Sequence, residues 1–337
     1  MLHGHGDDGY RYAKKIKADF STNVWYGGEP AGLKEHLLER WNIVNRYPEV
    51  IAESLSEKIA GHFRLAAENI LVNNGSTESL YLIAQAWQNT SSTIVVPSFA
   101  EYEDACTLYQ HSLTFFDLND LSPELKVTTD LFFICNPNNP TGAVFTGIEE
   151  LLANNPRTIF VVDEAFIDFT LSVGSILSLV ERFGNLIVLH SLTKNYAIPG
   201  LRLGYIAAHA VIITRLKTFK FPWSVNALAL EAGHFIFDNF QQIQIPLANL
   251  LKDKEEFIRS LANSPVKLSE SHTHFFLAEN KQGTASALKI FLLEDFGLLI
   301  RDASNFRGLG PNHFRLATLS PDKNQLLVEA LEVWMNR

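Results

Sequence analysis

The sequence predicts an α/β protein with a large domain on a mostly parallel β-sheet and a smaller C-terminal domain of α+β texture. Through the first two thirds of the chain, short runs that are apolar at nearly every position alternate with longer helical patterns, as in parallel sheets covered on both faces. After Pro222 long amphipathic stretches take over. The 337 residues, 47% of them hydrophobic, suffice for one large core or two medium ones. We therefore expect an N-terminal arm, a large domain and a small domain, over residues 1–28, 29–240 and 241–337.

The expected strands of the large domain are rich in β-branched and aromatic residues. They cover residues 70–72, 93–96, 131–134, 158–162 and 186–189. Amphipathic patterns predict helices over residues 224–239 and 247–261. In the small domain, strand-like residues 275–277, 298–300 and 314–316 alternate with helices over 285–294 and from about residue 322.

Composition and charge exclude several classes of protein. The 28 Lys plus Arg against 37 Asp plus Glu give a net charge of −9, which argues against a nucleic-acid surface, because phosphate backbones are held by clustered positive charge. The two cysteines, Cys106 and Cys135, cannot make a structural zinc site, and a reducing compartment fits them best. Neither a signal peptide nor a run of roughly 18 apolar residues is visible. We expect a cytoplasmic protein without a metal or a membrane partner.

The loops that follow the strands must decide the chemistry, because periodicity cannot distinguish one α/β enzyme from another. The G-x-G-x-x-G motif of nicotinamide sites and the G-x-x-x-x-G-K-S/T motif of triphosphate sites are both absent. The loop of residues 74–78 instead opens a helix with a glycine and the hydroxyls of Ser76 and Thr77. Free N–H groups and the positive end of the helix dipole suit a phosphate there. For this loop alone, an N-cap role for Ser76 is the commoner interpretation.

Three further loops carry polar residues at the ends of expected strands. In residues 136–142, Asn139 precedes a proline, so its extended backbone can aim the amide into a cleft; a plain turn is the alternative. Asp163 interrupts a buried strand, and a buried carboxylate needs a cationic partner such as a ring nitrogen. Lys194 and Arg202 follow the next strand. Lysine is the side chain that condenses with a carbonyl group.

The loops N-P-N-N-P-T-G, D-E-A-F and S-x-T-K with P-G-L-R-x-G-Y, in this order, resemble the fold type I pyridoxal phosphate enzymes of the aminotransferase class. The resemblance covers most of the chain and implies pyridoxal 5′-phosphate as the cofactor. It implies that Lys194 is the catalytic lysine that joins the cofactor, that Asp163 pairs with the pyridine nitrogen and that Asn139 contacts the phenolic oxygen. The other cofactor-binding residues that it implies here, mainly around the phosphate, are Gly75, Ser76, Thr77, Ser191, Thr193 and Arg202.

Two aromatic positions extend the resemblance. Phe99 matches the residue that stacks on the cofactor ring, with ordinary core packing as the alternative. Tyr47 matches a residue that reaches the cofactor phosphate of the neighbouring subunit, which implies a homodimer with shared active sites; a structural turn is the alternative. Phe166 stands where many relatives carry tyrosine, so a second hydrogen bond to the phenolic oxygen is missing.

Two subfamilies with phosphate-monoester substrates are the most similar, the threonine-phosphate decarboxylases and the histidinol-phosphate aminotransferases. The His-Gly-His-Gly opening and the segments 19–23, 301–309 and 314–317 resemble the decarboxylases, although residues 24–28 lack their proline-containing turn. This resemblance implies decarboxylation of O-phospho-L-threonine to (R)-1-aminopropan-2-yl phosphate in cobalamin biosynthesis, beneath the N-terminal arm. An arginine fork suits a carboxylate or a phosphate. The candidate substrate-binding residues are Arg315 for the carboxylate, Arg301 with His3 or His5 for the phosphate, Asn139 and Asn23.

The reaction type stays open at the level of sequence. Loss of carbon dioxide or of the α-proton depends on which bond lies perpendicular to the cofactor ring, and no residue pattern reports that angle. A histidinol-phosphate aminotransferase, which also needs a dicarboxylic amino donor, is the enzyme alternative. A regulatory protein that only binds the cofactor is the alternative from another class, and the presence of both Lys194 and Asp163 disfavours it.

Overall fold

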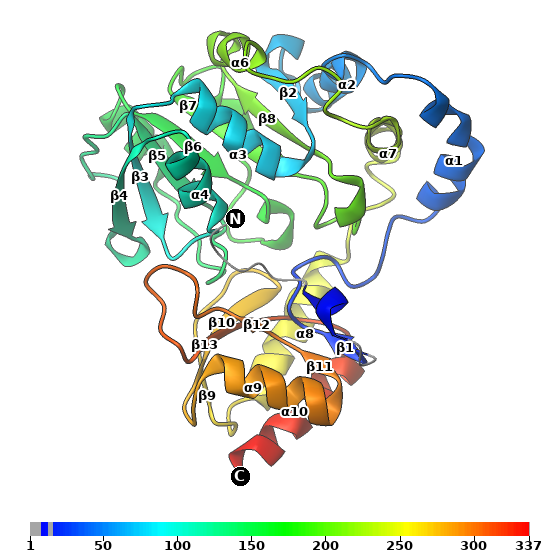
Figure 1. The fold of residues 1–337 in the computed structure, drawn as a ribbon, viewed down its shortest axis with the longest axis vertical. Helices are drawn as coiled ribbons and strands as arrows, with labels where there is room; N and C mark the ends of the chain where they lie inside the picture. The colour runs from blue at the N-terminus through cyan, green and yellow to red at the C-terminus, as the bar shows by residue number, and fades with distance from the viewer. Residues whose placement is uncertain (1–7, 13–15, 337) are drawn as a thin grey trace.

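The computed structural model describes residues 8–12 and 16–336. A seven-stranded sheet flanked by helices fills the upper part of Figure 1, and a four-stranded sheet with three helices fills the lower part. We call these parts the large and the small lobe. The predicted fold class, a mostly parallel α/β sheet followed by a smaller α+β unit, is confirmed.

The large sheet is mixed, with parallel strands at its centre. Its strands in spatial order are β2 (Ile70–Asn73), β8 (Gly204–Ala208), β7 (Leu186–Ser191), β6 (Ile159–Asp163), β5 (Leu131–Cys135), β3 (Ser91–Val96) and β4 (Ser112–Asp117). β8 runs antiparallel to β2 and β7, and the other pairs are parallel. The pattern of apolar runs misses β4, a partly exposed edge strand, and β8, whose Gly-Tyr-Ile-Ala-Ala sequence lacks a β-branched run.

Both faces of the large sheet are buried. Val161 and Val162 are neighbours in β6 yet belong to different hydrophobic cores, because successive side chains of a strand point to opposite faces. One core contains residues of α2 (Glu53–Phe63), α5 (Ile148–Asn154) and α7 (Ala227–Asp238), and α1 (Leu33–Glu39) contacts α7. The other contains residues of α3 (Gly75–Ala86), α4 (Glu101–Leu108) and α6 (Ala210–Lys217).

The small lobe combines an antiparallel sheet with helices and with a segment from near the N-terminus. Its strands are β12 (Arg301–Asp302), β13 (His313–Ala317), β10 (Phe275–Asn280) and β9 (Val266–Leu268), and its helices are α8 (Leu247–Ser260), α9 (Ala285–Phe291) and α10 (Pro321–Met335). β1 (Ala18–Asp19) pairs in parallel with β11 (Leu298–Leu299), and Phe20 enters the core of this lobe. The expected boundaries at residues 28 and 240 stay predictions.

The direction of the strands brings the loops of interest to one edge of the large sheet. β5, β6 and β7 are parallel neighbours, so their carboxyl ends lie side by side. Asn73 at the end of β2 and Ser191 at the end of β7 both pair with Gly204, which adds the loop after β2 to the same edge. Among the described residues, no helix combines the length and the apolarity that a bilayer span requires.

Candidate active site

The turn between β2 and α3 has the geometry of an anion site. α3 begins at Gly75, whose φ of +79° lies in the left-handed region that glycine adopts without steric cost. The first N–H groups of a helix have no acceptor within it, and Ser76 and Thr77 line a cavity at this point. Arg202 closes the other side, because a Cβ at position 75 would lie 2.5 Å from its Nη2. Donors and one cation therefore converge on the same space.

Gly204 in β8 lets the loops after β2 and β7 approach each other, and we call the anion site between them the cradle. A Cβ at position 204 would lie 2.6 Å from the carbonyl oxygen of His190 and 2.9 Å from the backbone nitrogen of Ser76. The hydroxyls of Ser191 and Thr193 lie 2.9 Å apart beside it. Only a residue without a side chain fits between these backbones, so the loops after β2 and β7 form one site.

Asp163 at the end of β6 is a buried carboxylate, 4% exposed. Its Oδ2 accepts a hydrogen bond from the Tyr102 hydroxyl (2.7 Å) and its Oδ1 accepts one from the backbone N–H of Ala165 (2.9 Å). Burial raises the pKa of Asp163, and these two donors counteract that shift. A neighbouring cation would favour the charged form further. Tyr102 was not singled out in the sequence, although it stands three residues after Phe99, whose ring it meets edge to face.

Lys194 lies in the loop after β7 and lines the same cavity of about 230 Å³. Its backbone carbonyl accepts hydrogen bonds from the N–H groups of Trp25 (2.9 Å) and Ala197 (3.3 Å). The segment near the N-terminus therefore fixes the main chain of the lysine. The other expected site residues that line the cavity are Asn23, Ser76, Thr77, Phe99, Asn139, Asp163, Ser191, Thr193, Arg202, Arg301 and Arg315.

The small lobe contributes two arginines that lie directly opposite each other. Arg301 in β12 and Arg315 in β13 are register partners in the antiparallel pair. Arg315 donates to Asn139 Oδ1 and to the carbonyl oxygen of Ser21 (2.6 Å). Burial, and then the charge of Arg301, lowers the pKa of Arg315 to about 9. Like charges opposite each other destabilise a sheet, so this arrangement is suited to an anionic ligand.

Buried donors without acceptors mark the same place. Arg315 Nε and Asn23 Nδ2 are buried and have no hydrogen-bond partner within residues 8–12 and 16–336, and both residues line the cavity. A buried donor left unpaired costs about 1–3 kcal/mol. A ligand with acceptor oxygens would remove that cost.

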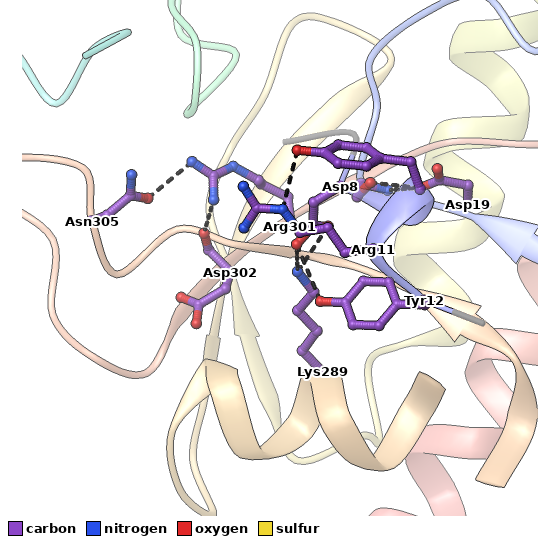
Figure 2. A network of polar contacts seen from close by, with 10 residues as sticks. Asp8, Arg11, Tyr12, Asp19, Lys289, Arg301, Asp302 and Asn305 are labelled. Carbon is purple, nitrogen blue, oxygen red and sulfur yellow. Dashed lines mark hydrogen bonds and ion pairs between the residues drawn. The ribbon is translucent and has the colours of Figure 1, made fainter. Parts of the chain in front are cut away.

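Figure 2 shows Arg301 between the main chain of Asp302 and the side chain of Asn305, whose Oδ1 accepts from Nη2 at 2.9 Å. Burial lowers the pKa of Arg301, while the carboxylates of Asp302 and Asp8 act in the opposite direction. Asp8 forms an ion pair of 2.7 Å with Lys289 of α9. Asp8, in the described part of the expected N-terminal arm, therefore anchors its segment on the small lobe, beside Arg301.

Phe166 and His274 add aromatic rings at the cavity, one in its lining and the other in contact with Asn23. Phe166 lines the cavity and packs edge to face on Phe275, so the position that many relatives fill with tyrosine offers no hydroxyl here. His274 was not singled out in the sequence. It is buried, it lies 3.2 Å from the carbonyl oxygen of Asn23 through Nε2, and its ring packs on Phe169 at 3.9 Å. Burial lowers the pKa of His274 to about 3, so a neutral histidine supports Asn23.

Gly75 is not itself among the residues that line the cavity, although its neighbours Ser76 and Thr77 are, and three further expected site residues are absent from the described lining. Tyr47 is 83% exposed and packs against Trp223, with the ring centroids 5.2 Å apart; it is not among the residues that line the cavity. His3 and His5 lie outside the described residues. A role for Tyr47 in the site of a second subunit stays a prediction.

Comparison with known proteins shows which family this chain is similar to. The family model described as aminotransferase class I and II matches residues 15–331. The threonine-phosphate decarboxylase of Salmonella typhimurium is 31% identical over 332 residues, which are 93% of this chain and 90% of that protein. The histidinol-phosphate aminotransferase of Symbiobacterium thermophilum is 30% identical over 301 residues, 86% of this chain and 82% of that protein.

A solved structure agrees with these matches. The L-threonine-O-3-phosphate decarboxylase of Porphyromonas gingivalis superposes with a TM-score of 0.91 at 38% identity, covering 95% of this chain and 100% of that one. The family expected from the loop motifs is therefore confirmed.

Proposed function

Since the chain belongs to the aminotransferase class I and II family, we propose that it is a pyridoxal phosphate enzyme that decarboxylates O-phospho-L-threonine to (R)-1-aminopropan-2-yl phosphate. The observation that carries the proposal is the pair of buried arginines, Arg301 and Arg315, facing each other across β12 and β13. Two like charges in register favour a ligand with two anionic groups over a ligand with one. A substrate with both a carboxylate and a phosphate supplies two.

The residues fit the cofactor. Gly75 has no Cβ, which would otherwise crowd the guanidinium of Arg202. The free N–H groups at the start of α3 suit a phosphate. Asp163, held by Tyr102 and by a backbone N–H, offers a buried negative charge to a protonated ring nitrogen. Phe99 and Lys194 line the space between these two ends. We assign the phosphate to the cradle, the ring nitrogen to Asp163 and the covalent link to Lys194.

The chemistry is divided between the cofactor and the chain. Bound pyridoxal phosphate supplies an aldehyde that condenses with an amino group and a ring that accepts the electron pair of the broken bond. Asp163 keeps the ring nitrogen protonated. Arg315, oriented by Asn139 and the Ser21 carbonyl, holds the substrate carboxylate, while Arg301 holds the phosphate. The bond between the α-carbon and the carboxylate would break and carbon dioxide would leave. Lys194, freed as an amine when the substrate amino group takes its place, would donate a proton to the α-carbon.

Histidinol-phosphate aminotransferase activity is the second candidate, because relatives of that name align with 86% of this chain. The greater identity and coverage of the decarboxylase structure support the decarboxylase. An assay with O-phospho-L-threonine alone, against histidinol phosphate plus 2-oxoglutarate, tests the choice. We expect carbon dioxide in the first mixture. Glutamate in the second mixture without carbon dioxide in the first would assign the aminotransferase activity instead.

We also propose that the enzyme acts as a homodimer through an exposed apolar surface. This surface comprises Trp41, Val44, Tyr47, Val50, Phe221 and Trp223, which are between 42% and 83% exposed. The backbone N–H of Trp223 donates to the backbone carbonyl of Val50, which joins residues 221–223 to residues 41–50. Mixing Lys194→Ala and Tyr47→Ala chains should restore some activity, because one hybrid site is then intact. Sedimentation as an active monomer would refute the shared site. The cytoplasmic location stays a prediction.

A further inference from the structure

A buried lysine lies behind the phosphate cradle and has no place in the proposed chemistry. Lys220 follows α6, and its side chain is fully buried. It is not among the residues that line the cavity. Burying a cation is costly unless it is paired and hydrogen-bonded, and burial lowers the pKa of Lys220 while Glu78 opposes that shift. Its partners therefore indicate what the lysine does.

The partners of Lys220 flank the turn that opens α3. Its Nζ donates to Asn73 Oδ1 at 2.8 Å and to Ser224 Oγ at 2.9 Å, and it lies 3.4 Å from both carboxylate oxygens of Glu78. Asn73 ends β2 and donates in turn to Ser79 of α3 at 3.0 Å. Lys220 thus connects the last residue before the turn with the first turn of the helix after it.

Glu78 accepts a hydrogen bond at the cradle, but its negative charge lies close to where the cofactor phosphate would bind. Its Oε2 accepts from the backbone N–H of Asn74, the residue before the helix, which leaves the following N–H groups for a ligand. The same carboxylate sits in the first helical turn, where the phosphate of the cofactor would bind. Two anions at one helix terminus repel each other, and a cation within hydrogen-bonding range of the carboxylate offsets that repulsion.

We propose that Lys220 is a positioning residue for the cofactor phosphate. It neutralises Glu78 and holds the ends of the turn so that the N–H groups of residues 75–77 face the phosphate. The inference rests on the proposed assignment of the cofactor phosphate to this cradle. It concerns the phosphate alone and not the aldehyde or the ring, and this separation makes it testable.

The test compares two ligands on the purified apoprotein by absorbance titration, pyridoxal phosphate and pyridoxal, which lacks the phosphate. In Lys220→Met the dissociation constant of pyridoxal phosphate should rise about tenfold to a hundredfold, the range of a lost charge-assisted hydrogen bond. The constant for pyridoxal should change by less than about threefold. Lys217→Met, at the exposed end of α6, is the matched control and should change neither constant.

A second variant separates charge from structure. Glu78→Gln keeps an acceptor for the Asn74 N–H without the negative charge, so it should bind pyridoxal phosphate as tightly as the wild type or more tightly. It carries the test if Lys220→Met does not fold. Weaker pyridoxal phosphate binding by Glu78→Gln would overturn the neutralising role. Equal losses for both ligands in Lys220→Met, or no loss, would overturn the positioning role. Failure of the wild type to bind pyridoxal phosphate would instead refute the proposed function.

Discussion

Replacing Gly75 with alanine tests the phosphate cradle most directly, because the structure shows what the added methyl group would meet. The Cβ would lie 2.5 Å from Arg202 Nη2 and 3.1 Å from Cζ. The guanidinium is the far end of a flexible side chain, so it can move aside and lose its contact with the phosphate. A charge-assisted hydrogen bond contributes about 1.5–3 kcal/mol, and the affinity for pyridoxal phosphate should therefore fall about tenfold to a hundredfold.

The same substitution has a second, independent cost. Residue 75 has a φ of +79°, and a residue with a side chain pays about 1–2 kcal/mol for the left-handed region. Thermal or urea unfolding of the apoprotein should show this loss of stability, and cofactor titration should show the loss of affinity.

A matched control lies in α2. Gly61→Ala introduces a Cβ with nothing within 4 Å in the last turn of α2, where the higher helix propensity of alanine, about 1 kcal/mol in a helix interior, favours it over glycine. It should stabilise the apoprotein and leave cofactor binding unchanged. Wild-type affinity and stability in Gly75→Ala would refute both the proposed position of the phosphate and the role of Arg202.

Two further predictions concern the ends of the cavity. Borohydride reduction should fix the cofactor to Lys194 in the wild type and should give no covalent product with Lys194→Ala; a product at another lysine would contradict the assignment. Burial raises the pKa of Asp163, so the folded apoprotein binds a proton at this carboxyl group more tightly than the unfolded chain does. The stability contributed by the bound proton is lost as the pH rises through the raised pKa. Apo Asp163→Asn should therefore gain stability relative to the wild type as the pH rises from the ordinary range of a carboxyl group through the raised pKa, yet lose most turnover when loaded. A difference in unfolding free energy that does not change with pH would contradict a buried, titrating carboxylate.

The sequence alone determined the kind of chemistry, because the informative residues sit in short loops directly after strands. Asn139, Asp163 and Lys194 lie within a few residues of buried apolar runs that can be recognised locally. For that reason the large lobe and its cofactor loops could be predicted from the sequence. In the structure β5, β6 and β7 are parallel neighbours, so the ends of these strands bring the three residues together at one edge of the sheet.

How distant segments complete the site depends on the tertiary fold. The opposition of Arg301 and Arg315 depends on the register of two strands, and the support of Asp163 by Tyr102 joins a helix to a strand 61 residues further along the chain. The same holds for Lys220, which contacts Asn73 across 147 residues. Such contacts leave no local periodicity or motif in the sequence. They follow from packing, in which each buried polar group must find its partner wherever the fold brings one within reach.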